Sequence, residues 1–396
     1  MKKVALVAAA ISMMVLCMMP VYAAGSEGNV GAFKDLDKSH WAVSEIMNGV
    51  QHGYVTGYTD HTFKPNAEVT RAEYVKMIVA ALKLDIAELE GTWYEPYVEA
   101  AREHKLVAAS DFVKGDWNTP MSRLEMSRVA ARAVGESTTE DDKWLYLATK
   151  KGLITGVDKR GTLGAQLRTT RAQAVTIIER VLAVKAGKKL PVDKYAVSSA
   201  ELAWHKTNIF TVMPEVFVTD PKDYAGKTIE ELWREDKMVL DSKDGKYRGE
   251  LEALIAIDLE DPNDPNLKLL PDINKLKWFN NNYEMTNLMV KDHMDSYVLY
   301  FKGREIYNKD TKLYSKKEYV PFNVRGIESP NIKDFFKGEL NRVTTIYTKA
   351  DGDLPAMIVP KKEWGSSSDI VISIFTPSFS NSTYKSEEIL RLASLK

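Results

Sequence analysis

The sequence predicts a multidomain protein in which an all-α half, a central three-helix bundle with flanking helices, precedes a β-rich α+β domain. Two observations predict this. A pattern of capped amphipathic helices occurs three times between residues 33 and 185, and strand-like runs dominate from residue 206 onward. The 396 residues, 44% hydrophobic and 28% charged, suffice for two or three packed units. The formal net charge of -1 argues against nucleic acid as a partner.

Residues 1–24 have the composition of a secretory signal peptide. Two lysines precede an uncharged run from Val4 to Met19, and small residues follow it up to Ala23. This run is shorter than the ~20 residues that span a bilayer comfortably, so we expect export, with no membrane association after cleavage. The one cysteine, Cys17, lies inside this segment. The mature chain is therefore expected to lack disulfides and Cys-ligated metals.

The helical half is predicted from a threefold repeat marked by Arg71, Arg123 and Arg171. In each repeat a first helix ends before a turn-rich loop, and a second helix then begins with TRAE, SRLE or TRAQ. Apolar residues in the second helices recur at i, i+3 and i+4, the pattern of one buried face. We expect the three faces to pack on one another. The expected repeats are residues 33–84, 92–135 and 140–185.

Each second helix also begins with the spacing of a capping box, in which a hydroxyl and a carboxylate or amide satisfy free backbone amides. We assign six residues to this structural role: Thr70, Glu73, Ser122, Glu125, Thr170 and Gln173.

The repeated arginines follow the caps directly, at the first helical position. A cation beside the positive end of a helix dipole is disfavoured by roughly 0.3–1 kcal/mol. Helix formation therefore does not explain them, and we predict that they bind an anion. The alternative is a long solvated side chain that pairs with a neighbouring carboxylate.

These motifs resemble the S-layer homology (SLH) domain. The first repeat carries nearly the whole pattern: FKD from residue 33, HWA from residue 40, TFKP from residue 62 and TRAE from residue 70. The resemblance implies a pseudo-threefold bundle, a pseudo-trimer, with grooves between adjacent repeats. It also implies that the grooves bind a pyruvylated secondary cell-wall polymer, whose carboxylate lies against Arg71, Arg123 and Arg171.

The repeats differ from one another, so one or two working grooves are expected rather than three. The third repeat lacks the HWA element and has Gln173 in place of Glu, and the second has Ala109 in place of the glycine. Gly57 and Gly156 keep that glycine and belong to the predicted carbohydrate-binding residues.

Two tryptophans complete the predicted carbohydrate-binding set. A core position is favoured for Trp41, because a Trp at a helix start is often buried. Trp117 lies in the polar loop KGDWNTP and is better placed to face a ligand.

The second half begins after a basic, Gly- and Pro-containing segment, residues 186–205, that is typical of a linker. Residues 206–396 are expected to form the β-rich domain, with turns at Asp244-Gly245 and Asp351-Gly352 and short helices at 227–236 and 331–340. The predicted strands are 208–220, 250–260, 295–307, 341–350, 355–360 and 369–379.

No motif in this half indicates catalysis. The acidic run 258–266 is compatible with calcium but is more simply a solvated turn, and two histidines, His205 and His293, are too few for a multi-histidine metal centre. We therefore predict no enzyme, cofactor or metal.

The sequence supports two functions. The first is a secreted S-layer or surface-associated protein, held non-covalently at the wall of a Gram-positive-type bacterium. Its partners would be the wall polysaccharide and, for the C-terminal domain, copies of itself or other surface proteins. The alternative is an SLH-targeted cell-wall hydrolase with its catalytic residues in the C-terminal domain.

Overall fold

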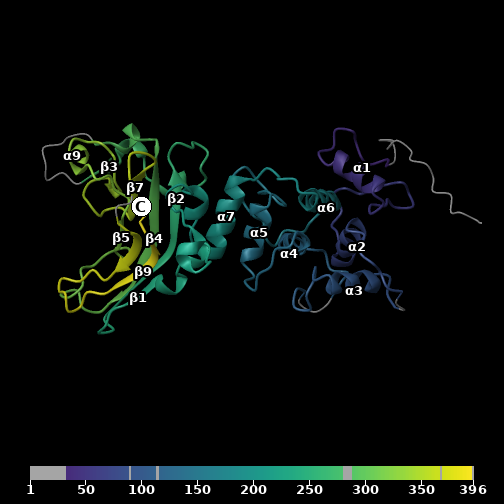
Figure 1. Ribbon diagram of the computed structural model, residues 1–396, viewed down its shortest axis with the longest axis horizontal. Helices are drawn as coiled ribbons and strands as arrows, with labels where there is room; N and C mark the ends of the chain where they lie inside the picture. Colours follow the sequence, from purple (N-terminus) through teal and green to yellow (C-terminus); the bar gives the residue numbers. More distant parts are fainter. Residues whose placement is uncertain (1–32, 89–90, 113–115, 280–287, 366–367, 395–396) are drawn as a thin grey trace, which may run out of the picture.

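The computed structural model describes residues 33–88, 91–112, 116–279, 288–365 and 368–394. The predicted signal peptide and Cys17 lie outside these residues. Figure 1 shows a helical half at one end of an elongated molecule and a sheet-rich half at the other, with helix α7 between them. The expected order, helices first and sheets second, is confirmed.

Three pairs of helices form the helical half. The first helices are α1 (Val43–Gln51), α3 (Glu95–Glu103) and α5 (Lys143–Lys150). The second helices are α2 (Arg71–Ala81), α4 (Arg123–Ala133) and α6 (Arg171–Lys185). The apolar faces of the second helices are buried in one shared hydrophobic core, as their periodicity predicted.

All three second helices begin with a complete capping box. At α2, for example, the Glu73 amide donates to Thr70 Oγ1 at 3.2 Å, and the Thr70 amide donates to the Glu73 carboxylate at 2.8 Å. Gln173 completes the same arrangement with its amide oxygen at the start of α6. Each cap is worth about 1 kcal/mol, so the sequence specifies where these helices start.

The segments before the three second helices are joined by a ring of backbone hydrogen bonds. The Val69 amide donates to the Thr169 carbonyl, the Thr169 amide to the Met121 carbonyl, and the Met121 amide to the Val69 carbonyl, at 2.8–3.0 Å. Because each segment is bonded to both others, the starts of α2, α4 and α6 are held beside one another.

The predicted linker, residues 186–205, is wrong from residue 194 onward, where the chain forms α7 (Lys194–His205). Asp193 caps this helix by accepting from the amides of Tyr195 and Ala196. Its face with Val197 and Trp204 packs into the core of the helical half. The sequence predicts a linker here because a Gly- and Pro-containing stretch lies just upstream of the cap.

The sheet-rich half contains two antiparallel sheets. The six-stranded sheet has the order β1 (Val239–Asp241), β2 (Tyr247–Asp258), β4 (Ser296–Asn308), β7 (Ala356–Pro360), β6 (Thr344–Tyr347), β3 (Lys277–Trp278). The three-stranded sheet has the order β5 (Phe322–Arg325), β8 (Ile370–Phe375), β9 (Ser386–Leu392). Apolar residues of both sheets share one core, so the sheets pack face to face.

Five of the six predicted strands overlap observed ones, and the segment 208–220 does not. It begins with helix α8 (Ile209–Val212). The buried Glu201 carboxyl group accepts from the amides of Phe210 and Thr211, and the Asn208 side chain pairs with the backbone of Ala256. These partners are distant in sequence or on another element, so tertiary contacts overrode the local strand pattern.

The remaining short elements join the strands. The helix expected within 331–340 is α9 (Ile332–Phe335). The helix expected within 227–236 is replaced by two 3-10 turns, η2 (Glu230–Leu232) and η3 (Glu235–Lys237). The other 3-10 turns are η1 (Pro221–Tyr224), η4 (Leu267–Leu269), η5 (Ile273–Lys275) and η6 (Val290–Asp292).

Candidate carbohydrate-binding grooves

The three repeated arginines are buried, each 7–8% exposed, and each reaches a loop of a different repeat. Arg71 donates to the Asp116 carbonyl at 3.1 Å, and Arg123 to the Thr155 carbonyl. Arg171 donates to the carbonyls of Phe63 and Thr56, at 2.9 and 3.2 Å. The arginines are therefore not solvated, and each joins two repeats. The pairing with a neighbouring carboxylate that the alternative expects is nevertheless found at Arg71 and, at a longer distance, at Arg171.

The charge partners of these arginines differ, and the capping residue of the adjacent repeat decides the difference. Arg71 forms an ion pair with Glu125 at 2.5 Å. Arg171 lies 3.9 Å from Glu73. The corresponding neighbour of Arg123 is the neutral Gln173. The positive charge is thus neutralised at Arg71 and partly balanced at Arg171. At Arg123 no capping carboxylate balances it.

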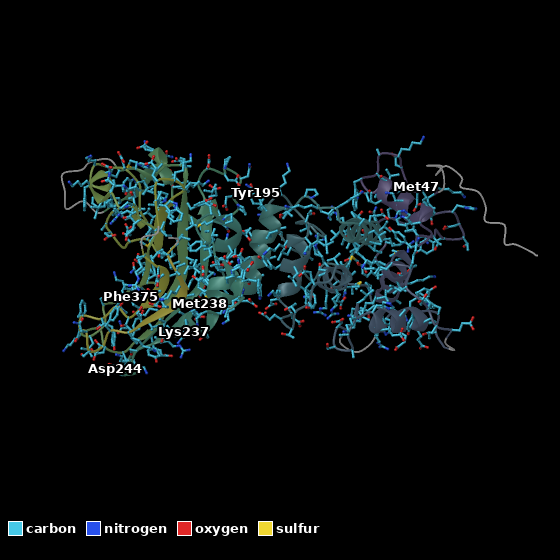
Figure 2. The ribbon with its side chains drawn as sticks, viewed as in Figure 1. Met47, Tyr195, Lys237, Met238, Asp244 and Phe375 are labelled. Atoms are coloured by element: carbon cyan, nitrogen blue, oxygen red, sulfur yellow. The ribbon has the colours of Figure 1, made fainter. Side chains whose placement is uncertain are left out.

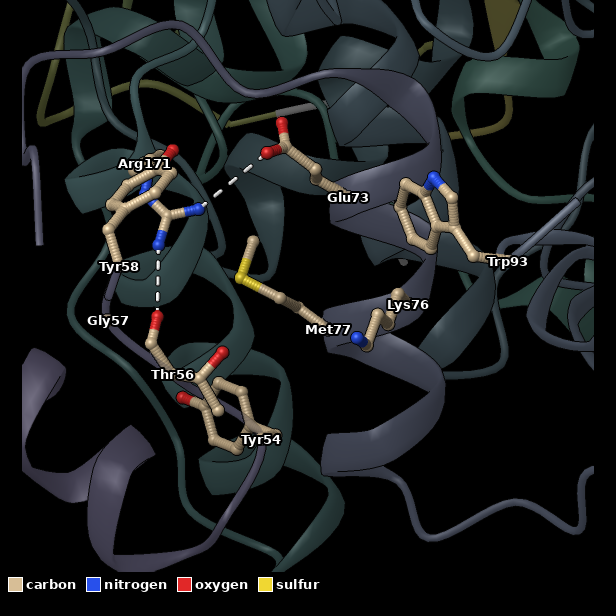
Figure 3. Close-up of a pocket in the computed structure, with 9 residues that line it drawn as sticks. All are labelled: Tyr54, Thr56, Gly57, Tyr58, Glu73, Lys76, Met77, Trp93 and Arg171. Carbon is tan, nitrogen blue, oxygen red and sulfur yellow. Dashed lines mark hydrogen bonds and ion pairs between the residues drawn. The ribbon is translucent and has the colours of Figure 1, made fainter. Parts of the chain in front are cut away.

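A pocket of about 260 Å³ opens beside Arg171, and we call it the Arg171 groove (Figure 3). In this view the guanidinium lies next to the ring of Tyr58, with Lys76 and Trp93 on the opposite side. Trp93 is 52% exposed, so it offers an apolar face to solvent. The lining residues are Tyr54, Thr56, Gly57, Tyr58, Glu73, Lys76, Met77, Trp93 and Arg171.

An equivalent pocket of about 410 Å³, the Arg123 groove, opens beside Arg123. Its loop comes from the third repeat and its tryptophan, Trp41, from the first. A second arginine, Arg180, joins it from α6 and donates to the Leu153 carbonyl at 3.2 Å. The lining residues are Trp41, Arg123, Ile154, Thr155, Gly156, Val157, Gln173, Thr176, Ile177 and Arg180.

The electrostatics of the Arg123 groove favour an anion. Burial and the like charge of Arg180 lower the pKa of Arg123, and burial lowers the pKa of Arg180, against which the charge of Glu45 acts. Two desolvated cations in one groove destabilise each other. In addition, Arg123 Nε is buried and has no hydrogen-bond partner among the described residues. A bound carboxylate would relieve the repulsion, and guanidinium groups bind carboxylates through paired hydrogen bonds.

In the second repeat, whose loop Arg71 reaches, charged side chains pair with one another. Asp111 pairs with both Arg128 and Arg132 of α4. The guanidinium of Arg132 lies 4.7 Å from the ring centre of Trp144, which is only 3% exposed. Together with the Arg71–Glu125 pair, these contacts pair the charges around the second repeat with one another. The expected number of working grooves, one or two, stays a prediction.

The two tryptophans singled out from the sequence exchange their expected environments. Trp41 is 60% exposed and lines the Arg123 groove, so the core position favoured for it is wrong. Trp117 packs against the core, with its ring 5.0 Å from that of Phe112. Trp93, a third tryptophan that could offer a flat face to a sugar ring, was left out of the predicted set but lines the Arg171 groove. Its signal was positional, because Trp41 and Trp93 each lie two residues before a first helix.

Gly57 and Gly156 line the two grooves at equivalent positions. A Cβ atom on Gly57 would lie 2.3 Å from the Phe33 ring, and one on Gly156 would lie 2.5 Å from the Gly161 Cα. Both glycines are therefore required for close packing of the loop. This packing brings the carbonyls of Thr56 and Thr155 to the arginines.

The acidic run 258–266 is occupied by partners of its own. Asp261 accepts from Lys194 at 2.6 Å and from Tyr195 at 2.7 Å, and Asp258 pairs with Lys361 at 2.6 Å. Asp264 accepts from two backbone amides of the same turn. Within the described ranges, no group of three or more His, Cys, Asp or Glu side chains is arranged to hold a metal ion.

Comparison with known proteins agrees with the helical half. Residues 32–75 match the family model for the S-layer homology domain, so this chain carries an SLH domain. In the part of the chain that the structure describes, no helix is long and apolar enough to cross a membrane.

Three curated relatives indicate where such sequences occur. The chain is 30% identical over 104 residues to a cellulosome-anchoring protein of Acetivibrio thermocellus (23% of this chain, 22% of the relative). It is 26% identical over 168 residues to a surface-layer 125 kDa protein of Lysinibacillus sphaericus (38% and 14%), and 29% identical over 177 residues to an amylopullulanase of Thermoanaerobacterium thermosulfurigenes (38% and 9%). The matches thus span less than a quarter of each relative.

Proposed function

We propose that the chain is a secreted surface protein, held non-covalently at the bacterial cell wall by its helical half. The observation that carries the proposal is the Arg123 groove, where Arg123 and Arg180 face the neutral Gln173 beside the exposed ring of Trp41. An arginine pair with no capping carboxylate suits an anionic group. An exposed indole suits the apolar face of a sugar ring.

The proposed ligand is a pyruvylated secondary cell-wall polymer, because its pyruvyl ketal presents a carboxylate directly on a sugar. The carboxylate would pair with the guanidinium groups while the sugar packs on Trp41. The Arg171 groove would bind a second unit of the polymer more weakly, since Glu73 lies 3.9 Å from Arg171. Two linked sites on one polymer would raise the overall affinity by effective concentration.

The proposed organisation is a pseudo-trimer of three SLH repeats, residues 33–84, 92–135 and 140–185. It is supported by the ring of backbone hydrogen bonds through Val69, Met121 and Thr169 and by the cyclic order in which each arginine reaches another repeat. Residues 1–24 are proposed as the signal peptide, and residues 206–396 as the domain that the anchor displays. The proposed location is the wall or S-layer of a Gram-positive-type bacterium.

The test is co-sedimentation of the full chain with native cell walls and with walls stripped of the pyruvylated polymer. We expect binding to native walls and loss of binding to stripped walls. Exchanging Arg180 for Gln should weaken binding to native walls, because it removes one of the two cations of the Arg123 groove. The fold should tolerate the exchange, because Arg180 bonds a single carbonyl. Equal binding to both wall preparations would contradict the proposal.

The alternative, an SLH-targeted wall hydrolase, is favoured by one observation: an amylopullulanase and an exoglucanase are among the relatives. Matches to these enzymes cover 38% of this chain, so catalysis would have to reside in the part without such relatives. Incubating the chain with purified sacculi distinguishes the two functions. Clearing of turbidity would favour the hydrolase, and stable turbidity the anchor.

A further inference from the structure

A third groove, of distinct chemistry, lies in the sheet-rich half and is lined by residues of both sheets. It has a volume of about 430 Å³, within the ~300–1,000 Å³ typical of ligand sites. The six-stranded sheet contributes Thr345 and Met357, and the three-stranded sheet contributes Phe322 and Phe375. Figure 2 shows Phe375 in the sheet-rich half, far from the helical grooves.

Aromatic side chains dominate the opening of this groove, which we call the inter-sheet groove. Phe379 is 72% exposed and Tyr384 is 44% exposed, although both are large apolar groups. Tyr384 lies 5.9 Å from Phe375, ring centre to ring centre. Tyr319 and Phe322 line the floor, and their rings lie 5.8 Å apart. The groove therefore presents several flat apolar faces.

The loop that carries the two exposed rings is held in place by its own hydrogen bonds. The Thr376 amide donates to the Lys385 carbonyl at 2.9 Å, which closes the base of the loop. The Tyr384 amide donates to the Ser380 carbonyl at 3.0 Å, and the Phe379 amide donates to the Leu313 carbonyl at 3.1 Å. Because the loop is already ordered, its exposed rings lose little conformational entropy when a ligand binds, so the site is preorganised.

Polar groups with unused hydrogen-bonding capacity lie among these rings. The side chains of Ser315, Asn323 and Thr345 line the groove and have no hydrogen-bond partner among the described residues. One cation and one anion, Lys317 and Asp351, are the charged side chains among the described lining residues. The groove is thus electrically balanced, which distinguishes it from the cationic Arg123 groove.

From this combination we infer that the inter-sheet groove binds a short neutral oligosaccharide. A pyranose ring has an apolar C–H face that packs on an aromatic ring and an equatorial rim of hydroxyls that pair with hydroxyl and amide side chains. A charged ligand would find no excess of opposite charge. The inference does not depend on wall anchoring, because all the residues that carry it lie between 315 and 384.

The test is calorimetric titration of the full chain with a panel of short neutral oligosaccharides that includes glucose, xylose, galactose, mannose and N-acetylglucosamine oligomers. A proline-rich peptide serves as the competing ligand class, since aromatic grooves also bind such segments. The test variant is the double exchange Phe379→Ala, Tyr384→Ala. The control is Ile332→Ala, which removes another exposed apolar side chain (43% exposed) on α9, outside the groove.

We expect at least one oligosaccharide to bind the wild-type chain and the Ile332→Ala variant equally. The double variant should bind it about tenfold more weakly, from the loss of two stacking faces, with an unchanged melting temperature. Absence of binding across the panel, equal binding by the double variant, or binding of the peptide alone would each overturn the inference.

Discussion

The exchange Gln173→Glu tests the electrostatic basis of wall anchoring most directly. Glutamate completes the capping box of α2 and α4, so it should complete the box of α6 equally well. It would, however, place a carboxylate in the Arg123 groove. That is the arrangement that neutralises Arg71, where Glu125 lies 2.5 Å from the guanidinium.

The magnitude follows from the distance between the new carboxylate and the bound anion. Two unit charges about 4 Å apart interact by about 4 kcal/mol at an effective dielectric constant of 20. The groove is open to solvent, which screens the interaction, so we expect a loss of ~1–2 kcal/mol. This corresponds to a roughly 5- to 30-fold weaker affinity for the pyruvylated polymer.

The assay is the affinity of the full chain for native walls, measured by co-sedimentation over a range of wall concentrations. Gln173→Ala is the matched control: it removes the bond to the Thr170 amide, and so lowers stability by ~0.5–1 kcal/mol, but adds no charge. It should keep wild-type affinity. If Gln173→Glu also bound walls as the wild type does, the proposed role of the unbalanced arginines would be refuted.

Three further predictions follow from burial and packing. Trp41→Ala should weaken wall binding several-fold and change the melting temperature little, since the side chain is 60% exposed. Trp117→Ala should lower the free energy of unfolding by ~1–3 kcal/mol, because Trp117 packs against the core. Co-sedimentation and thermal melts of both variants check these expectations. Gly57→Ala should destabilise the chain by ~2 kcal/mol or more because its Cβ would overlap a phenylalanine ring at 2.3 Å, and Gly53→Ala, with open space around it, should cost only about 1 kcal/mol for its left-handed backbone; urea titrations compare them. Burial raises the pKa of Glu201 to about 8, so the folded state holds this proton more tightly than the unfolded chain does. Stability should therefore fall by up to ~4 kcal/mol as the pH rises from about 4.5 to 8. Glu201→Gln should abolish this fall in thermal melts across that pH range, and a variant with the wild-type pH profile would contradict the prediction.

Several features of the fold could be predicted from sequence because they depend on neighbouring residues. The capping boxes use residues three positions apart, and the apolar faces of the second helices use the helical period. The turns at Gly245 and Gly352 have positive φ angles of 68° and 77°, which glycine adopts readily. In each case the deciding interaction lies within a few residues.

Other features could not be predicted because their partners are remote in the chain. The local sequence of helix α8 is typical of a strand, but Glu201 and contacts with β2 stabilise a helix there. The environment of Trp117 is set by the rings of Phe112 and Tyr94, the residue directly before α3, rather than by the polar loop around it.

By itself, the sequence determined the starts of the three second helices, the recurrence of an arginine at each start and the presence of an SLH domain. Only the tertiary structure decided which arginine keeps an unbalanced charge. Capping by glutamate or glutamine looks equivalent along one helix, because both side chains satisfy the same amides. Packing places that residue against the arginine of another repeat, where Glu125 neutralises Arg71 and Gln173 leaves Arg123 without a capping carboxylate.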